Sequence, residues 1–126
     1  EAPVRKVICP LDIGKEALIF PEISEKIKQL NSTGEMFYSL FKRYRGGSFS
    51  TGLKMYDSTA VAYLLAPEIY TLSNEYVAIE TKGELTQGAS IIDINKKMGK
   101  EENAVVAVSV DADAFRKWFV AAVEKC

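Results

Sequence analysis

Asp57 is the residue of this sequence best placed to do chemistry. It follows a loop of small residues, 48–54, and opens a predicted apolar helix that Pro67 ends. A carboxylate at this position can cap the helix by accepting hydrogen bonds from the N–H groups of the first turn. It can also project into a cleft and bind a cation. The local sequence leaves both roles open.

The absence of histidine restricts the other chemistry that the chain could carry. Histidine is the commonest metal ligand and a general acid or base suited to neutral pH. Without it, the hydroxyls of Ser48, Ser50 and Thr51 have no histidine to activate them. Two distant cysteines, Cys9 and Cys126, do not make a disulfide framework or a zinc site. Any metal site is therefore expected to use oxygen ligands, which suit Ca²⁺ or Mg²⁺.

The sequence offers no feature typical of nucleic-acid or nucleotide binding. The chain has 16 basic and 17 acidic side chains and a net charge of −1, with no block of like charge. Its densest basic group, residues 42–45, falls at the end of a predicted helix, where cations offset the helix dipole. Residues 83–88 hold two glycines, but they join two predicted strands and favour a hairpin turn. We expect no nucleic-acid partner.

The composition is that of one globular domain. The 126 residues are 48 % hydrophobic and 26 % charged, enough to bury a core. No apolar run is long enough to cross a membrane and no signal peptide is visible, so we expect no membrane partner. Residues 1–4 read like the interior of a longer chain. We therefore expect a cytoplasmic protein and keep a periplasmic location as the alternative.

The elements that would position Asp57 predict a mixed α/β fold. Hydrophobic periodicity predicts strands over 4–9, 76–80, 91–94 and 104–110, and helices over 21–30, 33–44, 57–66 and 112–125. Residues 15–19 predict a short helical turn, and Gly46-Gly47 would end the second helix. Asp111 is expected to cap the last helix, and Asp12 to serve a turn or a cap.

Helical spacing also predicts which side chains face the core. The expected inward faces are Ile23, Ile27 and Leu30 in one helix; Phe37, Leu40, Phe41 and Tyr44 in the next; Val61, Leu64 and Leu65 after Asp57; and Phe115, Trp118, Phe119 and Val123 in the last.

Three segments resemble the family of inosine-uridine-preferring nucleoside hydrolases. Residues 56–71, YDSTAVAYLLAPEIYT, resemble a family segment with His-Asp, a few small residues, an aliphatic helix and a proline. Residues 7–13, VICPLDI, resemble a strand that ends in Pro-Leu-Asp. Residues 80–93, ETKGELTQGASIID, resemble a glycine-threonine-glycine hairpin. The three occur in the family's order, and the resemblance covers the chain from about residue 4 to residue 125.

The resemblance implies an α/β fold and cleavage of the N-glycosidic bond of ribonucleosides to ribose and a free base. It implies a Ca²⁺ ion that holds the ribose diol and a water, with Asp57 as one ligand. Tyr56 takes the position of a histidine that assists the departing base in part of the family, which implies a catalytic and substrate-binding role. Phe41 and Tyr44 are the nearest counterparts of aromatic residues that flank the base.

Two departures from the family pattern qualify this hypothesis. The aspartate cluster of the family's N-terminus, and the asparagine and glutamate that grip the ribose, are not in this sequence. We therefore predict that residues 1–126 form a single domain or fragment, the C-terminal portion of such a hydrolase. It would be inactive alone, partnered by the missing N-terminal portion and, we expect, homo-oligomeric. The alternative is a non-catalytic interaction domain on the same scaffold.

The second departure is Tyr56 itself. A phenol has a reference pKa of about 10, against about 6.5 for imidazole. Tyr56 can donate a hydrogen bond or stack on a base, but it is the weaker proton donor. Preference for purine or pyrimidine nucleosides stays open.

Overall fold

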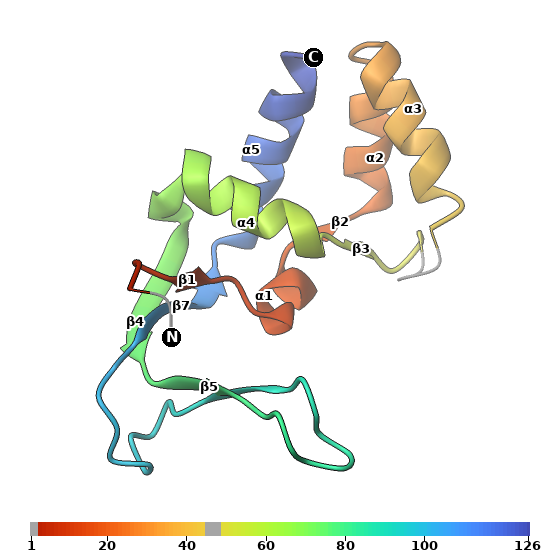
Figure 1. Ribbon diagram of the computed structural model, residues 1–126. Helices are drawn as coiled ribbons and strands as arrows, with labels where there is room; N and C mark the ends of the chain where they lie inside the picture. The colour runs from red at the N-terminus through yellow and green to blue at the C-terminus, as the bar shows by residue number, and fades with distance from the viewer. Residues whose placement is uncertain (1–2, 45–48) are drawn as a thin grey trace.

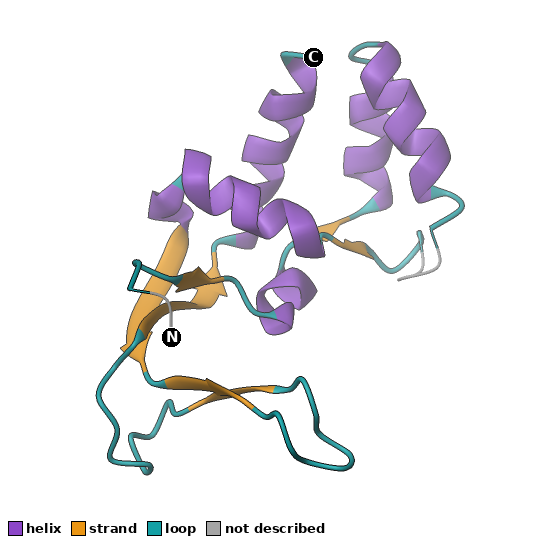
Figure 2. Ribbon diagram, in the orientation of Figure 1, coloured by secondary structure: helices purple, strands orange, loops and turns teal. Residues whose placement is uncertain are grey.

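The computed structural model describes residues 3–44 and 49–126 and has the predicted mixed α/β fold (Figures 1 and 2). The predicted helix end at Gly46-Gly47 and the start of the following loop at Ser48 lie outside these residues. In chain order the elements are β1 (Val7–Ile8), α1 (Leu11–Glu16), β2 (Leu18–Ile19), α2 (Pro21–Lys28), α3 (Ser32–Phe41), β3 (Leu53–Lys54), α4 (Tyr56–Leu65), the 3₁₀ turn η1 (Pro67–Ile69), β4 (Tyr70–Glu75), β5 (Val77–Ile79), β6 (Ser90–Ile92), β7 (Ala104–Val110) and α5 (Ala112–Glu124).

A three-stranded sheet with the order β1-β7-β4 forms the centre of the fold. β1 runs parallel to β7, and β4 runs antiparallel to it, with Tyr70 opposite Val110. β5 and β6 pair only with each other and form an arm that extends from the sheet on the side away from α2, α3 and α5 (Figure 1). β2 and β3 form a short antiparallel pair that leads from α1 toward the helices.

Helices α2, α3 and α5 pack side by side at the opposite end of the molecule (Figure 2). The predicted inward face of α5 is confirmed, since Phe115, Phe119 and Val123 are buried and Trp118 packs against the core. Asp111 caps α5 as predicted, accepting hydrogen bonds from the N–H groups of Asp113 and Ala114. None of the helices in the described residues combines the length and the apolar character needed to cross a membrane.

Several stretches differ from the sequence prediction in secondary structure. The predicted strand over 4–9 is reduced to β1, α1 begins at Leu11, and β3 lies within the predicted loop. The predicted turn over 15–19 is instead the end of α1 followed by β2, because Ile19 pairs with Leu53 and both side chains are fully buried. Residues 70–75 form β4, which the sequence did not predict. This strand carries threonine, serine and asparagine, and its conformation depends on pairing with the valine-rich β7.

The predicted inward face of α4 is wrong. Val61, Leu64 and Leu65 are exposed by 51 %, 77 % and 69 %. The buried face carries Thr59 and Ala62. These small side chains allow α4 to lie close to α1, and the large apolar residues point outward as a result.

Asn31 connects two of the packed helices. Its side-chain oxygen accepts a hydrogen bond from the Gly34 N–H and caps α3. Its side-chain nitrogen donates to the carbonyl of Val123, in the last turn of α5, at 2.8 Å. One side chain therefore fixes the start of α3 against the end of α5.

We predict that Asn31→Asp destabilises the fold although aspartate caps helices as well as asparagine does. The carboxylate cannot donate to the Val123 carbonyl and places two acceptors against each other, which we expect to cost roughly 1–2 kcal/mol of unfolding free energy. Asn31→Ser is the control, because it keeps the cap without the added charge. Urea denaturation that finds Asn31→Asp as stable as the original chain would contradict this role.

Candidate functional site

A cleft of about 550 Å³ opens between α3, the strand β3 and the start of α4. It brings together all four residues that the sequence singled out, namely Phe41, Tyr44, Tyr56 and Asp57. The remaining lining residues are Phe37, Leu40, Lys54, Met55, Ser58 and Phe119. One wall of the cleft is thus aromatic and the other is the N-terminal turn of a helix.

The aromatic wall is held by stacking within the helix group. The rings of Phe37 and Phe41 stack with centroids 5.9 Å apart and planes at 9°. Phe41 also lies 6.3 Å from the ring of Phe119 on α5. Of the stripe predicted for the core, Phe37 and Phe41 are partly buried and pack against the core. The prediction is wrong for Leu40 and Tyr44, which are 55 % and 47 % exposed; Tyr44 follows α3 at the rim of the cleft. A rigid apolar wall of this kind suits a flat aromatic ligand.

Asp57 faces the cleft from the first turn of α4 without acting as its cap. The N-cap position belongs to Met55, and no side chain makes a capping hydrogen bond there. The capping role left open by the sequence is therefore wrong. None of the ion pairs among the described residues involves Asp57, and its side chain is exposed. The positive end of the helix dipole favours a carboxylate at this position.

Tyr56, the first residue of α4, lies with its ring on the backbone of α1. A Cβ atom added to Gly14 would overlap Cδ1 of Tyr56 and lie 2.9 Å from its Cε1. Thr59 also stabilises the first turn of α4, because its hydroxyl donates a hydrogen bond to the Tyr56 carbonyl at 2.6 Å. The Tyr70 hydroxyl donates in turn to the Thr59 carbonyl at 2.8 Å, and burial raises the pKa of Tyr70, so that it stays protonated at neutral pH.

An exposed ion pair on α1 lies next to Tyr56. Lys15 donates to Asp12 at 2.6 Å, which is the side chain that the sequence assigned to a turn or a cap. This hydrogen bond is the main reason that the pKa of Lys15 is raised, and Tyr56 adds a smaller electrostatic contribution in the same direction. The phenol of Tyr56 is thus within electrostatic reach of an ammonium group.

Among the described residues that line the cleft, Asp57 is the one acidic residue. Within residues 3–44 and 49–126, no three acidic, cysteine or histidine side chains come together as a metal cluster. Asp57 offers a hard oxygen donor, the kind that Ca²⁺ and Mg²⁺ prefer, but these ions take about six or more oxygen ligands. The described residues could therefore supply one ligand of such a site.

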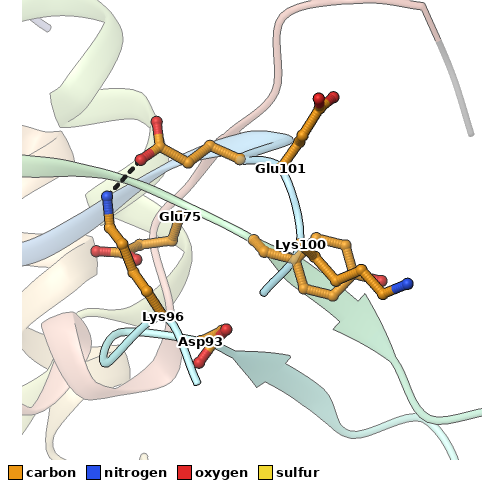
Figure 3. Close-up of a pocket in the computed structure, with 7 residues that line it drawn as sticks. Glu75, Asp93, Lys96, Lys100 and Glu101 are labelled. Atoms are coloured by element: carbon orange, nitrogen blue, oxygen red, sulfur yellow. Dashed lines mark hydrogen bonds and ion pairs between the residues drawn. The ribbon is translucent and has the colours of Figure 1, made fainter. Parts of the chain in front are cut away.

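A second, polar pocket of about 410 Å³ lies where the arm meets the sheet (Figure 3). Glu75, Asp93 and Lys96 line it, and none of the predicted site residues does. Asp93 accepts hydrogen bonds from the N–H groups of Lys97 and Met98, and Lys96 donates to Glu102 at 2.6 Å. These partners fold the loop that returns to β7, so we assign the pocket to the architecture of that loop.

Comparison with known proteins identifies the family. Residues 1–117 match the model of the inosine-uridine preferring nucleoside hydrolases. The chain belongs to this family. The resemblance to the C-terminal portion of such a hydrolase, which the three sequence segments predict, is confirmed.

The relatives of this nucleoside hydrolase chain are considerably longer. The chain is 45 % identical over 112 residues to the non-specific ribonucleoside hydrolase RihC of Salmonella enteritidis PT4 (strain P125109), covering 89 % of this chain and 37 % of that protein. A solved inosine-guanosine nucleoside hydrolase matches with a TM-score of 0.74 at 25 % identity, over 90 % of this chain and 37 % of that one. The plant nucleoside hydrolase PpNRh1 matches with a TM-score of 0.81 at 15 % identity, over 98 % and 42 %. The chain spans about two fifths of each.

The hydrogen bonds at the starts of α5 and α4 predict that Asp111 contributes more to the stability of the fold than Asp57 does. Asp111 accepts two backbone hydrogen bonds, and Asp57 accepts no capping bond. We expect Asp111→Ala to lower the unfolding free energy by about 1 kcal/mol. Asp57→Ala should cost about 0.5 kcal/mol or less, through the helix dipole alone. Thermal melts of both variants measure this, and equal losses would contradict a free Asp57 carboxylate.

Proposed function

We propose that the protein containing this chain hydrolyses the N-glycosidic bond of ribonucleosides, and that this chain supplies one side of the nucleoside pocket. Membership of the nucleoside hydrolase family supports the reaction class. The observation that carries the proposal is the cleft itself, which is lined both by Asp57, without an ion-pair partner in residues 3–44 and 49–126, and by the aromatic wall of Phe41 and Tyr44. A nucleoside presents a polar diol and a flat base, and such a cleft offers a partner for each.

We assign base binding to the aromatic wall. Phe41 stacks on Phe37 and contacts the tilted ring of Phe119, and these contacts hold its orientation without a ligand. Tyr44 lies at the exposed rim, where a ring can move over the open face of a base. Stacking on aromatic rings accepts any base, since each has a flat π-face. This wall therefore favours a nucleoside without selecting purine over pyrimidine.

We assign one Ca²⁺ ligand to Asp57. Its carboxylate is exposed to the cleft and unpaired among the described residues, and it lies at the positive end of a helix dipole. A bound divalent ion would hold the ribose hydroxyls and make water a better nucleophile. Because one carboxylate falls short of the ligand number that the ion takes, the other ligands must come from the remainder of the protein.

We assign the stabilisation of the departing base to Tyr56. Its phenol can donate a hydrogen bond, and the residue precedes Asp57 at the start of α4 and lines the cleft. A hydrogen bond from this hydroxyl would stabilise the negative charge that develops on the base as the bond to ribose breaks.

The exposed face of α4 fits this proposal. Val61, Leu64 and Leu65 form an apolar strip on the helix that carries Asp57. Large exposed apolar patches mark surfaces that another part of a protein covers. We propose that the longer part of the hydrolase fold covers this strip and brings its own ligands to the cleft. Homo-oligomer formation stays a prediction.

The function is tested by Asp57→Asn in the full-length protein. Asparagine lacks the charge that a hard cation needs. We expect unchanged thermal stability, weaker Ca²⁺ binding by calorimetry, and at least about a hundredfold loss of ribose release from inosine and uridine. The present chain alone is the control and should show neither hydrolysis nor micromolar Ca²⁺ affinity. Full activity of Asp57→Asn with an unchanged Ca²⁺ requirement would rule out the ligand role.

The covered strip predicts opposite effects of one substitution in two contexts. In the present chain, Leu64→Ser replaces an exposed residue and should change stability by less than about 0.5 kcal/mol while reducing self-association in light scattering. In the full-length protein it should cost about 2 kcal/mol, because the side chain is then buried. Ala60→Ser, small and exposed, is the matched control. Equal effects of Leu64→Ser in both contexts would show that the strip stays uncovered.

A further inference from the structure

Gly14 lies directly under the ring of Tyr56. It is buried within α1, and a Cβ atom added there would overlap Cδ1 of Tyr56 and lie 3.2 Å from its Cα. The first contact is with the ring and the second is with the backbone of α4. The overlap with the ring is the more severe, so a side chain at position 14 would displace the ring of Tyr56.

The backbone of Gly14 does not require glycine. Its conformation is helical, and it is not among the described glycines with positive φ, which are Gly52, Gly88 and Gly99. Glycine inside a helix costs about 1 kcal/mol relative to alanine. The position thus carries a cost in helix propensity that local conformation does not explain. The contact with Tyr56 is the feature that excludes a side chain.

We propose that Gly14 is a positioning residue for hydrolysis, which holds the phenol of Tyr56 at the edge of the cleft where it can donate a hydrogen bond to the departing base. This role rests on the proposed function. In that reaction the oxygen of water bonds to C1′ of the ribose and the bond from C1′ to the base nitrogen breaks. The electron pair of that bond stays on the base nitrogen. One proton of the water ends on the base, so that the products are ribose and the neutral free base.

The surroundings of Tyr56 support this orientation. Tyr56 lines the cleft, and Lys15, the residue after Gly14 in α1, interacts with it electrostatically. Lys15 is held in turn by Asp12. Helix α1 therefore supplies both the space for the ring and a cation beside it.

The test compares two ribosides in the full-length protein. Inosine needs its departing base stabilised, whereas the nitrophenolate of a nitrophenyl riboside leaves without help. We expect Gly14→Ala and Tyr56→Phe each to lower kcat for inosine by about 10- to 100-fold and to change the nitrophenyl riboside rate by less than about threefold. Gly34→Ala is the matched control, since its Cβ would overlap the carbonyl oxygen of Ile27 instead. Any loss it causes should be the same for both substrates.

A double variant keeps the test valid if Gly14→Ala folds poorly. Removing the ring with Tyr56→Ala should restore the thermal stability of Gly14→Ala, and the double variant should be no slower on inosine than Tyr56→Ala alone. Equal losses on both substrates, or losses that multiply in the double variant, would overturn the positioning role and leave the proposed function intact. A full-length protein that hydrolyses neither riboside would overturn both.

Discussion

The close packing of α4 against α1 is the constraint on which the candidate site depends. It depends on small residues, with Gly14 on α1 and Thr59 and Ala62 on α4. The carbonyl of Thr59 accepts a hydrogen bond from the Tyr70 hydroxyl, which fixes α4 to β4. Because the small face points inward, the first turn of α4 opens into the cleft. The large apolar residues of the helix point outward for the same reason.

The cleft lies between two parts of the fold that share one hydrophobic core. Its aromatic wall belongs to the packed helices α3 and α5, where Phe41 and Phe119 contact each other. Its other wall is the start of α4, which carries Tyr56 and Asp57. Among the described residues the cleft has one carboxylate, that of Asp57, and the chain spans about two fifths of its relatives. The proposed pocket therefore needs further ligands from the rest of the hydrolase.

The sequence predicted those parts of the fold whose reasons are local. The apolar period of α5 and its Asp111 cap are contained in the helix itself, and both predictions are confirmed. β4 was missed because its polar residues become a strand only by pairing with β7. The α4 face was wrong because the largest apolar residues were expected to face this chain's own core. Gly14 was missed because a contact 42 positions away in sequence leaves no local pattern.

The central claim is that Asp57 and the aromatic wall form one side of a metal-dependent nucleoside pocket. The most direct measurement is a crystal structure of the full-length protein with Ca²⁺ and a non-hydrolysable nucleoside analogue, with the ion located by anomalous scattering. The account predicts an oxygen of Asp57 at about 2.3–2.6 Å from the ion, with the base between Tyr56 and Phe41. An ion bound without Asp57, or a base bound away from this cleft, would contradict it.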